Sequence, residues 1–322
     1  MEISEKYAYK IWEKKSFSEA AKDLYVSQPS LSATIARLEK KLGFKIFDRS
    51  STPLSLTPQG RIYMDFLEES TEVENTLYQR IRALGDMTYG SLTVGGQIYA
   101  AIDLLPKICG EFYKHYPEIG VTVDIGSMGG MNNLFEKMKR NMLDLMLTYK
   151  YDPEEYQATP LFEERLVFVM PKSLAGADKL TQYAVSREEV LQKKYPPHKE
   201  IEDYSIFRSI KFVNNRENSD TAERMARILG DYDVAPYATI NVKQIDILYN
   251  MMLAGIGAVM VSDLFIANFP QRSDDLLYFI PKSQHAKRNL YIIKKKGMPH
   301  NAIVESFIAI ASSLCKSLTF LK

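Results

Sequence analysis

The stretch Ser16–Gly60, which reads SFSEAAKDLYVSQPSLSATIARLEKKLGFKIFDRSSTPLSLTPQG, decides the fold of the N-terminal part of the chain. It predicts two short helices joined by a tight turn and followed by a basic hairpin. Ser16 lies three residues before Glu19, as in a capping box, although Ser18 is an alternative cap. The first helix carries small residues that let a second helix approach closely, and it ends at Tyr25 and Val26.

The second helix of this stretch has one buried face and one polar face. Ser27 is placed to cap it, and Pro29 lies in its first turn, where the missing N–H has no cost. Its apolar face repeats at helical spacing through Leu31, Ile35, Leu38 and Leu42. The opposite face carries short polar groups and one cation near a helix N-terminus, which suit base edges and phosphates: Gln28, Ser30, Ser32, Ala33, Thr34 and Arg37.

A short hairpin follows the second helix. Gly43 is placed to end the helix, Ile46 and Phe47 form one strand, and Leu54 and Leu56 form its partner. The polar tip carries Arg49, as a wing that touches the DNA backbone or minor groove requires. These elements predict a winged helix-turn-helix whose DNA contacts are Ser27, Gln28, Pro29, Ser30, Ser32, Ala33, Thr34, Arg37 and Arg49. A helical subdomain without a nucleic-acid role is the plain alternative.

The segment resembles the N-terminal domain of LysR-type transcriptional regulators. The family pattern combines a helix rich in small residues, a Ser-Gln-Pro turn, an Ile-x-x-Leu-Glu helix, Leu-Gly, Leu-Phe-x-Arg and Leu-Thr-x-x-Gly. The matching residues here are Ser16, Phe17, Ala20, Ala21, Leu24, Ser27, Gln28, Pro29, Ser32, Ile35, Leu38, Glu39, Leu42, Gly43, Phe47, Arg49, Leu56, Thr57 and Gly60. Ile46 replaces the usual Leu, a conservative change. The resemblance implies sequence-specific binding to double-stranded DNA.

Composition is that of an ordinary globular protein. The 322 residues are 46% hydrophobic and 25% charged, with a net charge of +1, so any electrostatic attraction to DNA is local. Residues 1–60 hold ten Lys and Arg and seven Asp and Glu. No signal-peptide core or membrane-spanning run is visible, and we expect a cytoplasmic protein. Cys109 and Cys315 are expected to be reduced and buried, with a redox-sensing disulfide as the alternative.

A long helix between about Pro58 and Met87 follows the predicted winged helix-turn-helix, which is called the head below. Its apolar residues repeat in mixed three- and four-residue steps: Ile62, Phe66, Leu67, Val73, Leu77, Ile81 and Leu84. Such a stripe is too long for one side of a small domain and predicts pairing with a second copy of the helix. The alternative is a helix packed only on its own chain. In the family that this segment resembles, the helix makes an antiparallel dimer contact and sets the distance between two heads on a pseudo-palindromic site.

From Ser91 onward, predicted strands and helices alternate, which indicates an α/β domain with a largely parallel sheet. We expect strands at 91–94, 121–125, 144–147, 166–170, 211–213, 258–261 and 290–293, and helices at 101–115, 132–141, 219–229, 244–253 and 301–318. The resemblance extends here through Leu104–Pro106, Pro117, Leu143–Leu145, Leu166–Val169 and Ala254–Gly257. It implies a two-lobed fold like that of periplasmic binding proteins.

The fold class is therefore multi-domain: a winged helix-turn-helix and linker helix, then an α/β two-lobed effector domain. We expect the head at 1–58, the linker at 59–89 and the effector domain at 90–322. Lobe I takes about 90–162 and 268–322, and lobe II about 163–267. The crossovers are predicted near 161–166 and 266–270. Residues 174–207 form an excursion longer than the family's usual connection, with an exposed segment at Tyr195–His198 and no assigned role.

Loops at the carboxyl ends of parallel strands collect ligands, and helix N-termini favour anions. These rules select candidate effector residues, which the resemblance places between the lobes: Gln97, Ile98, Tyr99, Ala100, Thr148, Tyr149, Asn215, Asn218 and Ser219. The loop at 97–100 lacks the small hydroxyl common in the family, which favours an organic ligand with apolar parts, for instance a carboxylate, over an inorganic anion. The alternative is that each residue merely caps a helix.

The sequence gives little support to other functional classes, such as enzymes and metal-binding proteins. The four His residues show no metal-ligand spacing, and no catalytic triad motif, P-loop or dinucleotide fingerprint is present. We therefore expect no metal, no cofactor and no catalytic residue. A solute-binding protein is the stronger rival, because the C-terminal half alone has that pattern. The predicted head and the lack of a signal peptide argue against it. The expected assembly is a homodimer or homotetramer controlled by a small molecule, without a membrane partner.

Overall fold

The computed structural model describes residues 2–51, 53–84, 90–96, 104–125, 130–215, 220–230, 241–242, 245–268 and 275–317. The chain divides into two compact units. The first comprises Met1–Gly85 with Glu136–Leu143, and the second comprises Asp86–Phe135 with Asp144–Lys322.

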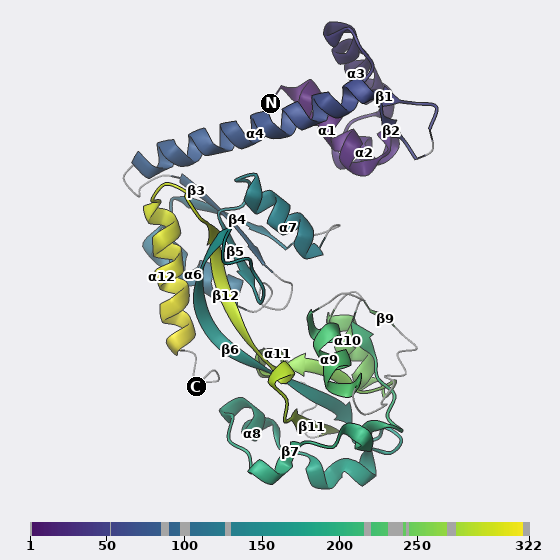
Figure 1. Ribbon diagram of the computed structural model, residues 1–322, viewed down its shortest axis with the longest axis vertical. Helices are drawn as coiled ribbons and strands as arrows, with labels where there is room; N and C mark the ends of the chain where they lie inside the picture. The colour runs from purple at the N-terminus through teal and green to yellow at the C-terminus, as the bar shows by residue number, and fades with distance from the viewer. Residues whose placement is uncertain are drawn as a thin grey trace. The chain divides into compact units, whose positions relative to one another are not determined.

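The N-terminal unit is a small helical domain with a two-stranded wing (Figure 1). Its elements are α1 (Ile3–Lys14), α2 (Phe17–Asp23), α3 (Gln28–Leu42), β1 (Phe47–Asp48), β2 (Ser55–Leu56) and α4 (Pro58–Leu84). The two strands pair antiparallel. Its core gathers Ala8, Ile11, Ala20, Ala21, Leu31, Ile35, Leu38, Ile46, Phe47, Met64 and Leu67. The predicted winged helix-turn-helix is therefore confirmed, although β1 lies one residue later than expected and β2 begins at Ser55 rather than Leu54.

Helix ends follow the predicted capping residues. The hydroxyls of Ser16 and Ser27 accept hydrogen bonds from the backbone N–H groups of Glu19 and Ser30, each at 3.3 Å. Ser16 rather than Ser18 is thus the cap of α2. Gly43 ends α3 with φ of 80°, a left-handed conformation in which glycine has no Cβ penalty.

Helix α4 begins in the head and extends beyond its core. Leu67 is buried in the head, whereas five other members of the predicted apolar stripe are exposed in the single chain: Ile62, Phe66, Val73, Leu77 and Ile81. Their exposed fractions lie between 54% and 71%. A helix packed only on its own chain would not leave this face uncovered. The side chain of Leu84 lies outside the described part.

The second unit is built on an eight-stranded sheet with the order β4-β3-β5-β12-β6-β11-β7, and β10 also pairs with β6. The strands are β3 (Gly90–Gly96), β4 (Ile119–Asp124), β5 (Leu145–Thr148), β6 (Tyr156–Pro171), β7 (Glu200–Ile201), β10 (Val259–Ser262), β11 (Leu276–Pro281) and β12 (Lys287–Lys295). A separate pair joins β8 (Asn214–Asn215) to β9 (Asn241–Val242).

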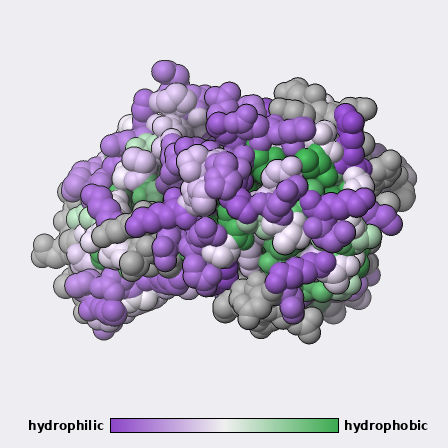
Figure 2. All heavy atoms as spheres, turned by 90° about the horizontal axis from the view of Figure 1, so that it is seen from below, coloured by the Kyte–Doolittle hydropathy of each residue, from purple (hydrophilic) through white to green (hydrophobic). Residues whose placement is uncertain are grey.

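Helices cover this sheet. They are α6 (Leu105–His115), α7 (Gly130–Lys139), α8 (Arg187–Gln192), α9 (Asp220–Gly230), α10 (Ile245–Leu253), α11 (Asp263–Asn268) and α12 (Ala302–Ser317). Short 3-10 turns are η1 (Ala177–Tyr183), η2 (Pro197–Lys199), η3 (Tyr204–Phe207) and η5 (Gln284–Ala286). The face seen from below in Figure 2 is mostly hydrophilic, with smaller apolar areas between the polar side chains.

Strand β6 belongs to both lobes and lies beside β12 (Figure 1). Its first half pairs antiparallel with β12, from Tyr156 opposite Lys295 to Arg165 opposite Lys287. Its second half pairs antiparallel with β10 and β11. Along that half the side chains alternate between two cores, with Phe168 on one face of the sheet and Val167 and Val169 on the other.

Two expectations for the second unit are wrong. The sheet is not largely parallel: β3, β4 and β5 are parallel, but β12, β10 and β11 all run antiparallel to a neighbour. The chain also does not return to lobe I near residues 266–270. Strand β11 still pairs with the lobe II part of β6, and Ala286 lies in a lobe II core, so the return is made by β12.

The remaining differences are local. The first crossover, expected at 161–166, lies within β6. The strand expected at 211–213 is only a single bridge from Phe212 to Ala258, followed by β8. The excursion at 174–207 is folded rather than loose, because Ala177, Leu180, Tyr204 and Phe207 are buried in a lobe II core. Within Tyr195–His198, Pro197 and His198 are exposed, and Tyr195 and Pro196 are half-buried.

Gly60 lies where α4 passes directly against the wing. A Cβ built on it would come 1.9 Å from the carbonyl oxygen of Ile46, and the backbone there cannot give way cheaply. We therefore expect Gly60→Ala to destabilise the head by about 3 kcal/mol. Trp12, the single tryptophan, packs against the head core and reports its unfolding in urea by fluorescence.

Gly110→Ala is the matched control for this substitution. Gly110 lies inside α6, and a Cβ added to it would have no neighbouring atom within 4 Å, so alanine there should leave the Trp12 transition unchanged. By circular dichroism it should stabilise the second unit by about 0.5–1 kcal/mol. A Trp12 transition that is equally stable in Gly60→Ala and the unaltered chain would refute the close approach.

Candidate nucleic-acid interface and ligand site

The predicted contact residues of helix α3 lie outside the buried core of the head. Ser27, Gln28, Pro29 and Ser30 are exposed at its start, and Ala33 and Arg37 are exposed one and two turns further along. Ser32 and Thr34 are half-buried. A guanidinium Nη2 of Arg37 donates to the hydroxyl of Thr34 at 3.2 Å, which holds the cation along the same face. The predicted helix residues thus all lie on the part of α3 that the head core leaves uncovered, spread over more than half of the helix circumference.

Buried Glu39 fixes the wing against α3. Its side chain is 1% exposed, and its Oε1 accepts hydrogen bonds from the backbone N–H groups of Ile46 at 2.9 Å and Phe47 at 3.4 Å. Its Oε2 lies 3.2 Å from Nζ of Lys45 and 3.8 Å from a guanidinium nitrogen of Arg49. One carboxylate therefore satisfies two N–H groups at the start of β1 and neutralises two exposed cations.

Arg49 joins the wing to the recognition surface. Its Nη1 donates to the hydroxyl of Ser32 at 3.4 Å, and its guanidinium lies 5.0 Å from the ring centroid of Phe17. The side chain is 47% exposed, so the cation is held in place and remains accessible to solvent. A cation beside the helix N-terminus suits a nearby phosphate.

The second site is a buried polar cluster where the two lobes meet. Arg288 of β12 lies opposite Glu164 of β6, and two guanidinium nitrogens lie 2.7 Å from Oε2 of Glu164. Its third nitrogen, Nη1, donates to Asp220 at 3.0 Å and to Thr221 at 3.1 Å, both at the start of α9. One arginine therefore links the crossover strands to lobe II.

Lys150 adds a second link between the lobes. It follows β5 of lobe I, and its Nζ lies 2.8 Å from Glu223 and 3.3 Å from Asp220 of lobe II. Burial alone would raise the pKa of Asp220, but the guanidiniums of Arg288 and Arg224 outweigh it and hold that pKa below its ordinary value. Asp220 thus stays ionised as the common acceptor of the cluster.

Thr148 and Tyr149 are the predicted ligand residues that the structure describes with their side chains. Both are buried, and the Thr148 hydroxyl donates to the carbonyl of Lys150 at 2.8 Å. The guanidinium of Arg288 lies 3.7 Å from the ring centroid of Tyr149, and burial raises the pKa of the Tyr149 hydroxyl. These two residues lie at the buried cluster rather than on an open loop.

The other predicted ligand residues cannot be placed from side chains. Gln97, Ile98, Tyr99, Ala100, Asn218 and Ser219 lie outside the described residues, and Asn215 is described only as part of β8. Their role stays a prediction.

The excursion at 174–207 contacts the opposite side of the same crossover strand. Arg165 of β6 lies 2.6 Å from Glu200 and 5.2 Å from the ring centroid of Tyr195. Lys193 donates from Nζ to the carbonyl of Glu163 at 2.7 Å and lies 3.3 Å from buried Asp263. The charged run at 163–165 is therefore held by partners on both sides of the sheet.

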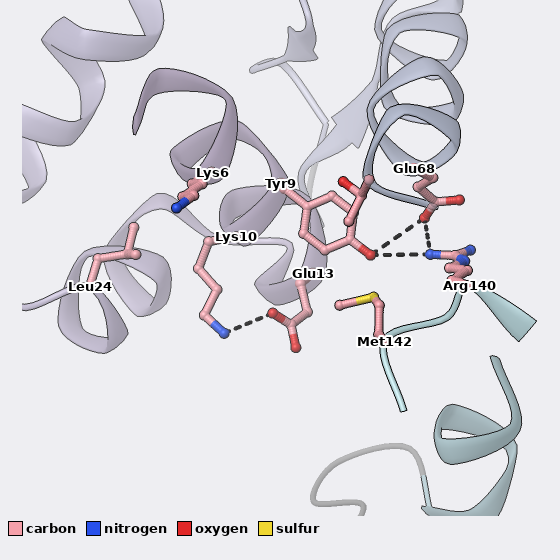
Figure 3. A pocket seen from close by; sticks show the side chains of 9 residues that line it. Lys6, Tyr9, Lys10, Glu13, Leu24, Glu68, Arg140 and Met142 are labelled. Carbon is pink, nitrogen blue, oxygen red and sulfur yellow. Dashed lines mark hydrogen bonds and ion pairs between the residues drawn. The ribbon is translucent and has the colours of Figure 1, made fainter. Parts of the chain in front are cut away.

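A pocket of about 210 Å³ lies within the first unit and is shown in Figure 3. It is lined by Lys6, Tyr9, Lys10, Glu13, Leu24, Glu68, Thr71, Arg140 and Met142. Arg140 donates to Glu68 at 2.6 Å and to the Tyr9 hydroxyl at 3.2 Å, and Lys10 pairs with Glu13 at 2.8 Å. Because these charges already pair with one another, we assign no ligand to this pocket.

The cysteines do not form the alternative redox pair, since both are free. Burial raises the pKa of the Cys109 thiol and raises that of Cys315 to about 12. Both thiols therefore stay protonated near neutral pH, which makes them poor nucleophiles.

Several residues of these sites do not stand out in the sequence. Glu39 enters only as part of the family pattern, and sequence reasoning does not select Arg288, Asp220 or Lys150. The run Glu163-Glu164-Arg165 inside an apolar strand is the available signal, because buried charges require partners from elsewhere in the chain.

A winged helix-turn-helix joined to a two-lobed α/β domain defines a ligand-responsive DNA-binding regulator. Residues 6–61 match the family described as "Bacterial regulatory helix-turn-helix protein, lysR family", and residues 86–205 match the "LysR substrate binding domain". The chain belongs to the LysR family of bacterial transcriptional regulators. It is a DNA-binding transcriptional regulator with an effector-binding domain.

Individual relatives are distant but match along most of the chain. The HTH-type transcriptional regulator YcgK of Bacillus subtilis is 23% identical over 263 residues, which cover 80% of this chain and 78% of YcgK. The solved complex of full-length CbnR with its target DNA has a TM-score of 0.61 at 17% identity and covers 97% of this chain and 99% of CbnR.

A third relative matches only the effector domain. The regulatory domain of Synechocystis CcmR in complex with 2-PG has a TM-score of 0.57 at 17% identity. It covers 71% of this chain and 99% of that domain. No helix among the described residues combines the length and the apolar character needed to cross a membrane.

Glu39→Ala tests the anchoring of the wing. The substitution leaves two buried N–H groups without an acceptor, and we expect a loss of about 3 kcal/mol in the urea unfolding of the head followed by Trp12 fluorescence. Glu39→Gln is the matched control, because it keeps an acceptor oxygen and loses only ion pairs to exposed cations, which contribute little. Equal losses in the two variants would show that charge, not hydrogen bonding, fixes the wing.

The buried carboxyl of Asp263 makes the free energy of unfolding of the second unit depend on pH. Burial raises its pKa to about 6, although Lys193 opposes the shift. Because the folded pKa exceeds the unfolded one, its contribution to stability is complete below about pH 4 and is lost as the pH rises through about 6. The loss is about 3 kcal/mol by the linkage between pKa shift and stability.

Asp263→Asn keeps the oxygen that accepts from the Leu264 N–H but does not titrate. Its free energy of unfolding, measured in urea between pH 4 and 8, should vary less with pH than that of the unaltered chain and should exceed it above pH 6. Parallel pH profiles in the two proteins would contradict the raised pKa.

Proposed function

We propose that this chain acts as a homo-oligomer that reads a pseudo-palindromic DNA site with helix α3 and the wing. The observation that carries the proposal is that Gln28, Ser32 and Arg37 all lie on the part of α3 that the head core leaves uncovered, with the anchored cation of Arg49 beside Ser32. One short head contacts few base pairs, so useful specificity requires two. The exposed apolar stripe of α4 supports assembly into a dimer or a dimer of dimers.

The control step of the proposal is the binding of a small organic molecule between the lobes. The described cluster holds three cations, Lys150, Arg224 and Arg288, against three carboxylates, Glu164, Asp220 and Glu223. With every charge balanced, an incoming carboxylate competes with Asp220 and Glu223 for the half-exposed Lys150. Exchange of that ion pair changes a direct link between the lobes. The ligand therefore binds one arrangement of the lobes more tightly than another and shifts the equilibrium between them.

The proposal includes no cofactor and no catalytic step, because the family to which the chain belongs consists of transcriptional regulators. It places the protein in the cytoplasm, where its DNA target lies. The relative CcmR, solved with 2-PG, supports a small ligand in a domain of this fold.

DNA selection from a randomised library, followed by binding measurements on the selected duplex, tests the first step. Gln28→Ala and Ser32→Ala should reduce discrimination between the selected and a scrambled duplex by about 10-fold or more, because they remove base-edge contacts. Arg37→Ala should instead lower both affinities and the salt slope of binding. If Gln28→Ala and Ser32→Ala retain full discrimination, α3 does not read the bases.

A thermal-shift screen of the full chain tests the second step, using mono- and dicarboxylic acids, each paired with its neutral amide. A true effector at 100 times its Kd should stabilise the chain by about 2.7 kcal/mol, whereas its amide should stabilise less. Tyr149→Phe removes one hydroxyl at the cluster and should reduce the shift. A shift that is the same for acid and amide, and unchanged in Tyr149→Phe, would place the ligand elsewhere.

A further inference from the structure

Tyr25 occupies a strained backbone position between the two helices of the helix-turn-helix. Its φ is 54°, in the left-handed region, directly after the C-cap of α2. The N–H of Val26 donates to the carbonyl of Ala21 at 3.1 Å, and the N–H of Tyr25 donates to that of Lys22 at 3.2 Å. These two hydrogen bonds form a Schellman motif, in which glycine is the usual residue at the position of Tyr25.

Packing of the Tyr25 side chain does not offset this strain. The Tyr25 side chain is 97% exposed, so its ring contributes almost no burial to the fold. Among the described non-glycine residues with positive φ, the others are Lys15, Asn141 and Lys193, and Tyr25 is the aromatic one. A glycine or asparagine would serve the turn better, so the aromatic side chain needs a reason outside the free protein.

The position of Tyr25 indicates that reason. It lies two residues before Ser27, the cap of α3, and next in the chain come Gln28 and Ser30, which are exposed on the same end of the helix. In a helix-turn-helix the helix before the recognition helix crosses the DNA backbone, and Tyr25 lies at the C-terminal end of that helix, α2. A phenol O–H is a known donor to phosphate oxygens.

We propose that Tyr25 is a DNA-backbone contact of this chain, with its hydroxyl donating a hydrogen bond to a phosphate oxygen beside the bases that α3 reads. This inference rests on the proposed function of α3. The left-handed backbone at Tyr25 lowers the stability of the free protein, and the hydrogen bond to phosphate gives this residue a role in the complex. A phosphate contact positions the helix but carries no base preference of its own.

Two variants separate the effect of the Tyr25 hydroxyl on DNA affinity from the effect of the backbone strain on stability. Tyr25→Phe keeps the ring and the strained backbone and removes only the donor, so the melting temperature of the head, followed by Trp12 fluorescence in the full chain, should not change. Affinity should fall about 3- to 10-fold, equally for the selected and the scrambled duplex. Tyr25→Gly should lower affinity by at least as much while raising the melting temperature by about 4 °C.

Methylphosphonate substitution in the selected duplex locates the contact. At one phosphate, removal of the charged oxygen should weaken the unaltered chain, and Tyr25→Phe should bind that modified duplex no more weakly than the unaltered chain does. Unchanged affinity of Tyr25→Phe on the unmodified duplex would overturn the proposal, as would a loss confined to the selected sequence. Gln28→Ala, measured in parallel, keeps the two failures apart: if Gln28→Ala loses discrimination while both Tyr25 variants bind normally, α3 reads DNA and only the Tyr25 contact is wrong.

Discussion

The pairing of β6 with β12, and the buried ion pair of Glu164 with Arg288 between them, is the constraint on which the effector domain depends. Strand β6 runs through both lobes, so the backbone hydrogen bonds alone would leave the lobes free to bend about the crossover. Arg288 adds a side-chain link to Asp220 of α9. Because removing one partner of a buried ion pair leaves an uncompensated charge, each member of the cluster is held by the others.

In the head, too, a buried charged side chain fixes the elements around it. A two-residue wing strand has too few hydrogen bonds to hold its own position, and buried Glu39 supplies the missing acceptors. Gly60 allows α4 to pass against the carbonyl of Ile46, which joins the wing to the start of the long helix. The recognition face is thus positioned by residues that lie behind it and never reach the DNA.

The head could be predicted almost residue by residue because its signals are local. Ser27, Pro29 and Gly43 act on their own helix, and the apolar spacing from Leu31 to Leu42 defines the buried face of α3. The effector domain was harder to predict, since strand direction and the place of the return crossover depend on partners more than a hundred residues away. The strand β11 carries no local mark that distinguishes lobe II from lobe I. Glu164 finds its charged partner, Arg288, on β12, and Arg288 in turn finds Asp220 on α9.

The excursion at 174–207 has a consequence for association between molecules. Strand β11 would otherwise end the sheet with a row of unpaired N–H and carbonyl groups, a template on which strands of another molecule could add. The two residues of β7 pair with its end, and one of them, Glu200, is charged and held by Arg165. A two-residue strand offers few free N–H and carbonyl groups to a strand of another molecule. The excursion at 174–207 therefore disfavours the addition of further strands at this end of the sheet.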